Sequence, residues 1–287
     1  MLKQSLFEAS LKKLGLLNVN NESSKVINNG AYKAYIKILY LPAGYQLTVD
    51  FNVYTTTQNS LFFVAPNQFL HIETVGQEEG YMIFYNRDFY CIQIHDAEVA
   101  CDGLLFNNIN KMPMVRVADE EIMAIDPLFN SIDEEFGLND TSQEEMIRTY
   151  LKQLLIKSTR IWKKQHLGQE LLQSNNELDF FRRFSVLVDA YYKEKHSVAD
   201  YADLLSMAAK TITNKFKRLN LPQPNEVIKD RIVLEAKRLL IHTSMTAKEI
   251  AYQLGYEDPA YFSRQFLQKT GESPSNFKKK YLMGIEA

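Results

Sequence analysis

The sequence predicts an α+β protein of more than one domain, in which a strand-rich N-terminal part precedes helices and an all-α C-terminal domain. Two patterns lead to this class. Up to about residue 118, short apolar runs alternate with turn signals, as in a β-sandwich or barrel. From residue 178 on, helix-capping signals are dense instead. The length of 287 residues also suits about two domains, at ~150 residues each.

The composition is that of a folded globular chain. Hydrophobic residues make up 46% and charged residues 24%, which excludes collagen-like and wholly disordered proteins. No apolar run reaches the ~18–20 residues that span a bilayer, and Met1–Asn20 lacks the apolar core of a signal peptide. Cys91 and Cys101 are the only cysteines, which argues against a disulfide framework and predicts a reducing, cytoplasmic location with no membrane partner.

Short strands are expected from residue 31 onwards. Ala31–Leu41 is rich in Tyr, Ile and Leu and ends at the turn signal Pro42-Ala43-Gly44. Residues 45–53 alternate between apolar and more polar side chains, which is the period of one half-buried strand. Three further apolar runs are interpreted as strands, namely Leu61–Ala65, Gly80–Tyr85 and Phe89–Ile94. Together these strands predict a first domain of residues 1–118.

Two helices and a linker are expected in residues 119–175. The first helix begins at the acidic run Asp119-Glu120-Glu121 and ends near Phe136. The second begins at residue 141 or 142, has two acidic residues in its first turn and reaches at least to His166. The segment Leu167–Glu177 is rich in Gln and Asn and is interpreted as the linker.

The second of these helices has an apolar stripe at a spacing of three to four residues. The stripe fits two interpretations, packing onto the strand domain and contact with a second copy, and one long stripe can serve both. We predict a homodimer. The side chains expected in the dimer contact are Met146, Ile147, Tyr150, Leu151, Leu154 and Ile161.

Charge is divided unevenly along the chain. Residues 1–175 contain 15 Lys and Arg against 21 Asp and Glu, whereas residues 176–287 contain 18 against 14. The net charge of −2 therefore combines an acidic part of −6 with a basic part of +4. A basic domain attached to an acidic one is typical of nucleic-acid binding, although a solvated surface of this charge is equally common.

Seven helices are expected in the C-terminal domain, residues 176–287. Ser197-x-x-Asp200 and Thr246-x-x-Glu249 resemble capping boxes. Asp258-Pro259 and Ser273-Pro274 each place a capping residue before a proline at the first helical position. The expected helices are about 178–194, 198–205, 209–219, 224–242, 247–254, 259–269 and 274–282.

Two segments of this domain resemble each other. Each has five small or apolar residues at nearly the same spacing, with one extra residue in the second copy. The first set is Ala202, Leu205, Met207, Ile212 and Phe216, and the second is Ala251, Leu254, Tyr256, Phe262 and Phe266. Each set describes a short helix, a tight turn and a second helix packed across the first. Residues 198–219 and 247–269 are therefore predicted helix-turn-helix motifs.

The exposed face of each second helix carries side chains that can read base edges in the major groove of DNA. The predicted base-reading residues are Lys210, Thr213, Asn214, Ala260, Ser263 and Arg264. The predicted phosphate contacts, which position a protein without specifying sequence, are Lys215, Lys217, Arg218, Lys229, Arg231 and Lys278. An ordinary helical hairpin with a solvated face is the alternative, and the presence of two copies argues against it.

The helix between the motifs sets their spacing. Its ~18 residues span roughly 27 Å. Successive major-groove faces of B-DNA lie ~34 Å apart. Two reading helices held by such a spacer can enter successive grooves on one side of a duplex.

A family resemblance is carried by residues 247–281. Its motifs are Glu249-Ile250-Ala251, Leu254-Gly255-Tyr256, Asp258-Pro259-Ala260-Tyr261-Phe262-Ser263-Arg264, Phe266, Thr270-Gly271 and Ser273-Pro274. Together they resemble the C-terminal signature of AraC/XylS-type transcriptional regulators, and the resemblance covers about residues 180–282. It implies a seven-helix domain that binds double-stranded DNA through two helix-turn-helix motifs. The family often has a Ser or a similar cap where this chain has Ala208, so the first reading helix begins less firmly.

The N-terminal part is similar to the cupin-like sensor domains that precede this module in many family members. The similarity rests on Pro66-Asn67-Gln68 and Gly103-Leu104-Leu105-Phe106. It implies a cupin-like β-barrel or sandwich that responds to a small-molecule effector, with some of the many aromatic side chains lining a pocket. RNA polymerase is a further candidate partner. The whole chain is then expected to be a bacterial, effector-responsive regulator of transcription.

The alternative is a cupin-type metalloenzyme, or a small-molecule-binding protein with a helical appendage. A metal site requires His with a carboxylate on neighbouring strands. This part of the chain offers His71, Glu73 and His95 but no His-x-His pair. Cys91 and Cys101 lie in apolar surroundings typical of packed thiols, and no Gly-rich phosphate loop is present. We therefore expect no metal, no cofactor and no catalytic residue.

Overall fold

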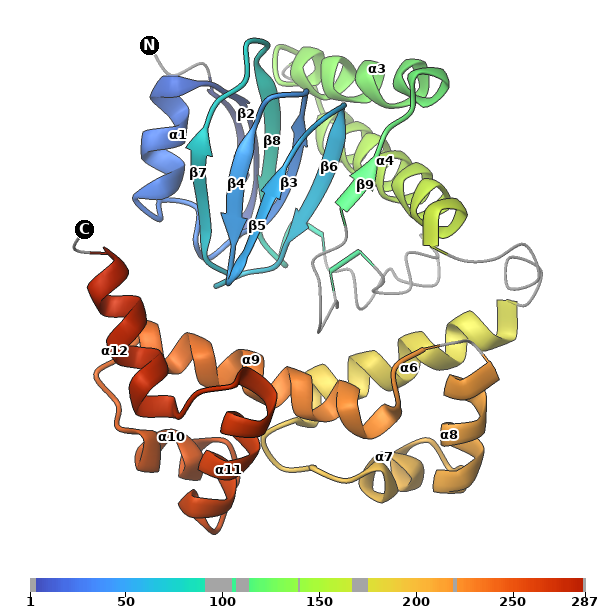
Figure 1. Cartoon of the computed structure of the whole chain (residues 1–287). Helices are drawn as coiled ribbons and strands as arrows, with labels where there is room; N and C mark the ends of the chain where they lie inside the picture. Colours follow the sequence, from blue (N-terminus) through green and yellow to red (C-terminus); the bar gives the residue numbers. More distant parts are fainter. Residues whose placement is uncertain are drawn as a thin grey trace. The chain divides into compact units, whose positions relative to one another are not determined.

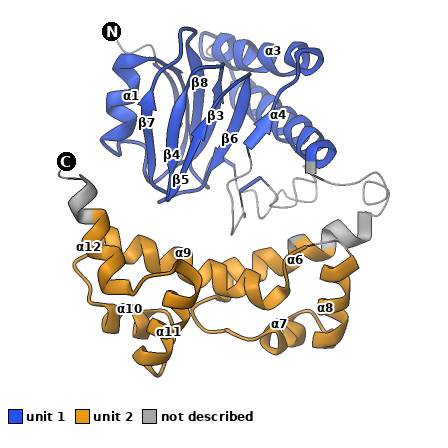
Figure 2. Cartoon of the chain, in the orientation of Figure 1, with its two compact units in different colours: residues 1–174 blue, residues 175–287 orange. Residues whose placement is uncertain are grey.

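The structure, a computed structural model, describes residues 4–90, 105–106, 114–138, 140–166, 175–218 and 221–285. The chain divides into two compact units, residues 1–174 and 175–287 (Figure 2). Unit 1 contains the described strands, and unit 2 is helical over its described residues (Figure 1). A strand-rich N-terminal part and a helical C-terminal domain are thereby confirmed. The finer limits at residues 118 and 175 stay predictions.

Unit 1 is built on two antiparallel sheets. The larger sheet has the strand order β1-β2-β8-β3-β6-β9, and the smaller has the order β5-β4-β7. The strands are β1 (Gln4–Ala9), β2 (Lys12–Val19), β3 (Ile36–Leu41), β4 (Gln46–Val49), β5 (Asn52–Thr55), β6 (Ser60–Val64), β7 (Leu70–Thr74), β8 (Gly80–Tyr85) and β9 (Met114–Arg116). The helices of unit 1 are α1 (Asn21–Asn28), α3 (Asp119–Glu135) and α4 (Gln143–His166) over the described residues.

The larger sheet is buried on both faces. Along β3, Leu39 and Leu41 belong to the core shared with the smaller sheet and α1. Ile38 and Tyr40 alternate with them and belong to the core shared with α3 and α4. The Tyr40 ring stacks on Phe129 of α3 at 5.2 Å. Because the two sheets share no strand pairing among the described residues, unit 1 is a sandwich of open sheets with two helices outside it, and not a closed barrel.

The apolar stripe of α4 lies in this core. Ile147, Leu151 and Leu154 are fully buried, and Ile161 is nearly so, in one cluster with the larger sheet. Packing onto the strand domain is therefore the correct interpretation of these four side chains. The prediction that they form a dimer contact is wrong, because one copy of the chain already encloses them. Met146 is exposed and Tyr150 half-buried, and the homodimer itself stays a prediction.

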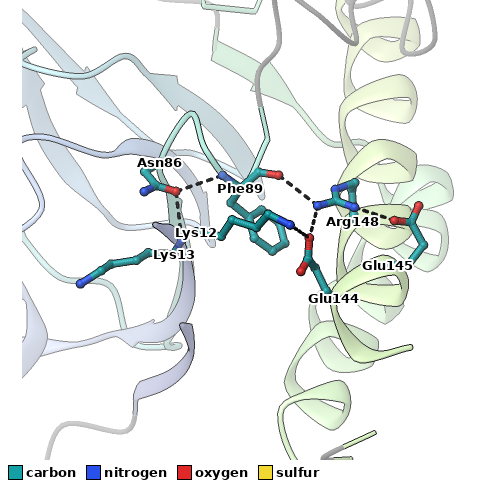
Figure 3. Close-up of polar contacts among 7 residues, drawn as sticks. All are labelled: Lys12, Lys13, Asn86, Phe89, Glu144, Glu145 and Arg148. Atoms are coloured by element: carbon teal, nitrogen blue, oxygen red, sulfur yellow. Dashed lines mark hydrogen bonds and ion pairs between the residues drawn. The ribbon is translucent and has the colours of Figure 1, made fainter. Parts of the chain in front are cut away.

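A polar cluster fixes the start of α4 on the larger sheet (Figure 3). Arg148 of α4 forms ion pairs with Glu144 and, at 2.5 Å, with Glu145. Its guanidinium lies 5.5 Å from the centre of the Phe89 ring, in the turn after β8. Glu144 also binds Lys12 of β2 at 2.7 Å, and this hydrogen bond lowers the pKa of the Glu144 carboxyl. The cluster therefore holds α4, β2 and the end of β8 together.

The smaller sheet contains a hairpin that the sequence pattern does not reveal. Residues 45–53 alternate as expected, yet they form two strands rather than one. Asp50 adopts a left-handed φ of 53° and reverses the chain between β4 and β5. Its carboxylate accepts hydrogen bonds from the side chain of Gln68 at 2.8 Å and the backbone N–H of Phe69 at 3.2 Å. A tertiary contact from a distant loop thus stabilises the turn.

Parts of the sequence prediction lie outside the described residues. They include most of the expected strand Phe89–Ile94, together with Cys91, His95 and Cys101. The hairpin β1–β2 has no counterpart in the prediction. Its strands alternate only partly, with Lys and Glu side chains on the exposed rim.

One charged side chain lies between the two sheets. Lys37 of β3 is 2% exposed. Its ammonium donates hydrogen bonds to the backbone oxygens of Tyr35 at 2.8 Å and Tyr32 at 3.2 Å. Burial lowers the pKa of Lys37 to about 8, although the carboxylate of Asp50 acts in the opposite direction. An ammonium in such a place is tolerated because backbone oxygens replace its water.

This burial predicts a pH-dependent stability. Between a pKa of about 8 in the folded chain and the ordinary 10.5, the unfolded chain binds a proton that the folded chain does not. The free energy of unfolding should therefore rise as the pH is raised through this window. We expect a rise on the order of 2 kcal/mol relative to Lys37→Met, whose side chain does not titrate. Denaturant unfolding across the window measures it, and equal pH slopes in the two proteins would contradict it.

Unit 2 is a helical domain that follows the predicted plan closely. Its helices are α6 (Asn175–Tyr191), α7 (Val198–Leu204), α8 (Ala209–Arg218), α9 (Pro224–His242), α10 (Ala247–Gln253), α11 (Pro259–Thr270) and α12 (Pro274–Ile285). Each corresponds to one of the expected helices, and the ends differ by no more than three residues. In the described part of the chain, no helix combines the length and the apolar character needed to cross a membrane.

Candidate nucleic-acid interface

Unit 2 contains two copies of one helix-turn-helix geometry, the second 49 residues after the first. The first helix of each copy, α7 or α10, begins with a capping box. The hydroxyl of Ser197 accepts from the Asp200 N–H at 3.3 Å, and that of Thr246 accepts from the Glu249 N–H at the same distance. Because a box satisfies N–H groups that a helix start leaves without partners, both motifs begin where the sequence predicts.

The turns after these helices also match. In the first motif the Met207 N–H donates to the Ala202 oxygen at 2.9 Å, and the equivalent bond in the second motif has the same length. The residue just before this N–H has a positive φ in both copies, 52° at Ser206 and 80° at Gly255. A left-handed residue at this place ends a helix and redirects the chain. The two second helices therefore leave their turns in equivalent ways.

The second helices, α8 and α11, each bury one face. Ile212 and Phe216 of α8 and Phe262 and Phe266 of α11 are at most 1% exposed. The six predicted base-reading residues lie on the remaining surface of these helices. Those exposed are Lys210, Thr213, Asn214, Ala260 and Arg264, and Ser263 is half-buried. The structure thus brings three of them together on each helix, and their contact with bases stays a prediction.

Two of these side chains also bond to their own helix. The Thr213 hydroxyl donates to the Ala209 oxygen at 3.1 Å, and the Ser263 hydroxyl donates to the Pro259 oxygen at 2.9 Å. Each hydroxyl keeps lone pairs that can accept a hydrogen bond from a base amino group. These bonds orient the two side chains before any ligand is present.

Arg264 lies near the start of α11. Its guanidinium is 3.6 Å from a carboxylate oxygen of Asp258 and 6.0 Å from the centre of the Tyr261 ring. The Arg264 and Asp258 side chains are 68% and 58% exposed, so water screens the pair and the guanidinium can exchange Asp258 for another partner. Tyr261 is absent from the predicted set although it is exposed. Its spacing of three residues from Arg264 on one helix is the signal that identifies it.

Four cations and no acidic residue lie on α8. Lys217 and Arg218 are exposed, as phosphate contacts require. Lys215 is half-buried, with its ammonium 4.9 Å from the centre of the Phe180 ring. Lys215, Lys217 and Arg218 lie in the last turn of α8, where the helix dipole favours cations.

Arg231 is not available for a phosphate, and its prediction is corrected. The side chain is 12% exposed and pairs with Asp189 of α6 at 2.5 Å and with Glu235 at 3.0 Å. The guanidinium also lies 3.9 Å from the centre of the Tyr192 ring. Because the guanidinium is paired with these two carboxylates inside unit 2, Arg231 joins α9 to α6 and does not face DNA.

Lys278 is half-buried, and its contact with a phosphate stays a prediction. Its ammonium donates to the backbone oxygens of Thr243 at 3.1 Å and Met245 at 3.0 Å, which joins α12 to the segment between α9 and α10. Lys229 is one-quarter exposed and pairs with Glu226 at 3.3 Å. The sequence does not reveal these pairings, because a lysine with an intramolecular partner cannot be told there from a lysine on an exposed basic surface.

The two motifs are carried by α9. This helix contacts α7 and α8 as well as α10, α11 and α12, and Figure 1 shows the first motif beside one end of it and the second beside the other. Lys269 of α11 forms ion pairs with Glu226 at 2.5 Å and Asp230 at 2.6 Å, both on α9. Ion pairs thus hold α9 to α6 and to α11, and the spacing of the reading helices is built into unit 2.

The two reading helices begin differently. The Asp258 carboxylate caps α11 by accepting from the N–H groups of Ala260 at 2.8 Å and Tyr261 at 3.1 Å, and Pro259 follows it. The helix α8 begins after Ala208, whose methyl group cannot accept a hydrogen bond. The first reading helix therefore lacks the side-chain cap that the second has.

Supplying a cap should stabilise unit 2. In Ala208→Asp, a carboxylate at this exposed position can accept from N–H groups of the first turn, and we expect a gain of about 0.5–1 kcal/mol in the free energy of unfolding. Ala209→Asp is the control, because it brings the same charge near the same helix end without the capping geometry. Thermal unfolding of the two variants decides, and an equal effect of both would contradict the missing cap.

The metal-site alternative concerns unit 1. Among the residues that the structure describes, no group of three or more His, Cys, Asp and Glu side chains is arranged to hold a metal ion. His71 is half-buried and its ring stacks on that of Phe69 at 6.1 Å. His95, the other expected ligand, lies outside the described residues.

A comparison with protein families identifies the same region. A family model described as a helix-turn-helix domain matches residues 201–280, which include most of the first motif and all of the second. A histidine kinase (P4) of Formosa agariphila is 30% identical over 100 residues, which are 35% of this chain and 7% of that protein. The transcriptional activator Btr of Bacillus subtilis is 33% identical over 77 residues, which are 27% of this chain and 15% of that protein.

The transcriptional regulator ExsA of Pseudomonas aeruginosa is 23% identical over 97 residues, which are 34% of this chain and 35% of that protein. The chain thus matches about a third or less of these relatives' length. Among solved structures, ToxT of Vibrio cholerae covers 96% of this chain and 97% of its own, at 14% identity and a TM-score of 0.41. The C-terminal domain of the response regulator yesN of Fusobacterium nucleatum covers 35% of this chain, at 20% identity and a TM-score of 0.33.

Proposed function

We propose, from the premise that residues 201–280 match a helix-turn-helix domain, that this chain is a regulator of the AraC type and controls transcription by binding a specific site on double-stranded DNA. The observation that carries the proposal is the repeat. In both motifs the first helix begins with a capping box, the turn makes the same backbone hydrogen bond, and the second helix buries two apolar side chains at equivalent positions. One helix, α9, connects the two motifs. A single motif of this kind is a common helical hairpin. Two motifs 49 residues apart can instead recognise two segments of one DNA duplex.

The chemistry of the exposed faces fits DNA bases. An Arg side chain prefers the two acceptors of guanine in the major groove, and an Asn side chain prefers the donor and acceptor of adenine. Arg264 and Asn214 are exposed on equivalent helices. We assign them the main sequence-reading roles, with Thr213, Ser263 and Lys210 beside them. Lys217 and Arg218 are assigned to the phosphate backbone.

The length of α9 fits the pitch of the duplex. Its 19 residues extend about 28 Å. Successive major-groove faces lie ~34 Å apart. We infer that both reading helices contact one side of the same duplex, in successive turns of the groove.

Unit 1 is assigned the regulatory role. It is a separately packed sandwich of two sheets with α3 and α4 on the outer face of the larger sheet. We infer that it responds to a small-molecule effector, in the manner of a cupin-like sensor domain, and that it pairs with a second copy. A change in unit 1 would then alter the fraction of unit 2 that is competent to bind DNA.

Selection from a pool of random duplexes tests the function. The purified full-length chain should enrich one motif made of two short conserved segments about one helical turn apart, ~10 base pairs centre to centre. Recovery of sequences without a common motif would contradict the sequence-specific reading that we propose. The same experiment shows whether sites occur singly or as repeats, and thus tests the dimer.

A phosphate contact and a base contact should respond differently to salt. Lys217→Ala removes an exposed cation, so it should weaken binding to the selected site and to unrelated DNA by the same factor. The slope of log K against log salt concentration should fall by about 0.9. Titrations at several salt concentrations measure both quantities. A loss confined to the selected site would show that Lys217 reads bases instead.

A further inference from the structure

The two reading helices are supported by different aromatic contacts. In the second motif, Phe266 of α11 packs against Phe277 of α12, with ring centres 5.6 Å apart. In the first motif, Phe216 of α8 packs against three rings of α6. The distances from Phe216 are 6.0 Å to Phe180, 5.6 Å to Phe181 and 4.9 Å to Phe184.

The first reading helix depends more on this external support than the second does. The helix α11 has Asp258 at its start and Gly271, with a φ of 81°, at its end. The helix α8 begins after Ala208, whose methyl group cannot cap it, and follows Ser206, a residue other than glycine held at a positive φ. A side chain in that conformation costs about 1–2 kcal/mol. Local interactions therefore favour α11 over α8, and tertiary packing on α6 has to make up the difference.

Two of the rings that support α8 lie in the part of α6 that comes first in the sequence. Helix α6 begins at Asn175, the first residue of unit 2, and Phe180 and Phe181 lie within its first two turns. The ammonium of Lys215, in the last turn of α8, lies 4.9 Å from the Phe180 ring. The segment after the other end of α6 contacts the second motif, where the centres of the His196 and Tyr256 rings lie 4.6 Å apart. The first turns of α6 thus contact the first motif, whereas the segment after α6 contacts both motifs, because the Tyr201 hydroxyl of α7 donates to the Lys195 oxygen at 3.0 Å.

We propose that the first turns of α6 position the first reading helix, so that a change in these turns alters DNA recognition through the first motif while the second motif stays formed. This inference rests on the function proposed above. It makes Phe180 and Phe181 positioning residues, which touch no base and act through Phe216 on Asn214 and Lys217. The second motif then provides a constant anchor on DNA, and the first decides whether the full site is read.

Two matched variants of the full-length chain test the proposal. Phe181→Ala removes a ring 5.6 Å from Phe216 of α8, and Phe277→Ala removes a ring 5.6 Å from Phe266 of α11. Amide hydrogen exchange is measured along α8 and α11, and preferred sites are selected from random DNA. Phe181→Ala should speed exchange in α8 about tenfold with α11 unchanged, and should erase one conserved segment of the site. Phe277→Ala should do the reverse, and Phe181→Leu should restore the lost segment.

The outcomes separate the two proposals. If Phe181→Ala changes both helices, or both segments of the site, to the same extent, the first motif has no separate support and the inference is wrong. If α8 exchanges no faster in Phe181→Ala than in the unchanged chain, the inference is also wrong. If the unchanged chain selects no DNA motif, the proposed function fails, and hydrogen exchange still decides whether α6 positions α8.

Discussion

Replacing Gly255 with alanine is expected to destabilise the second helix-turn-helix motif by about 2–5 kcal/mol. Two causes act together at this position. The φ of 80° lies in the left-handed region, where a Cβ costs about 1–2 kcal/mol. A Cβ would also lie 1.9 Å from the backbone oxygen of Lys193, a contact that no rotamer can relieve. The backbone must therefore move, and the turn between α10 and α11 with it.

Gly271→Ala separates these two causes. Gly271 has nearly the same φ, 81°, but no heavy atom lies within 4 Å of a Cβ built there. This variant should therefore show the conformational cost alone. Denaturant unfolding, with hydrogen exchange of α10 and α11 to localise the effect, measures both. Equal losses in the two variants would show that residue 255 does not lie against Lys193.

Replacing Arg264 with alanine is expected to weaken binding to the selected DNA site by about 1–3 kcal/mol, which is roughly 5- to 150-fold. The guanidinium is exposed on the face of α11 opposite Phe262 and Phe266, and its partner Asp258 is exposed as well. Because a bidentate contact to guanine distinguishes that base from the others, the preference at one base pair should relax. Binding to unrelated DNA should change little.

Competition titrations with all four bases at each position measure this loss. Gln268→Ala is a suitable control, since this residue is exposed on the same helix, one turn further along. Its effect should be small, because the N-terminal residues of a reading helix make the base contacts. An Arg264→Ala protein that keeps the full preference at every position would remove Arg264 from the base-reading set.

The helical unit was predictable because its signals are local. Capping boxes at Ser197 and Thr246 and prolines after Asp258 and Ser273 depend on neighbours within four residues. The helix limits derived from them agree with the structure to within three residues. The exposure of Asn214 and Arg264 follows from helical periodicity in the same way, once the buried residues of each motif are identified.

Side chains whose roles depend on distant partners were not predictable. Arg231 and Lys217 are both basic residues in helical segments, yet Asp189 and Tyr192 enclose the first and solvent surrounds the second. The stripe on α4 has the same ambiguity. An apolar helix face of that length fits a partner subunit as well as a sheet, and only the position of the larger sheet decides between them.

The hairpin at Asp50 shows the corresponding limit for strands. Alternation of side chains survives a reversal of the chain, because both arms of a hairpin keep the same period. The reversal itself depends on hydrogen bonds from Gln68 and Phe69, which are distant in sequence. The sandwich class was therefore accessible from the pattern of short apolar runs, whereas the number and order of strands were not.

The bracing of α9 has a consequence for the genes such a protein can control. Arg231 and Lys269 clamp this helix from two directions, so the interval between the two motifs is fixed by the protein and not adjusted to each target. One additional base pair between the two recognised segments would rotate the farther one by about 35° around the duplex axis. Promoters controlled by this protein would therefore tolerate changes of base sequence within the two recognised segments more readily than changes in the number of base pairs between them.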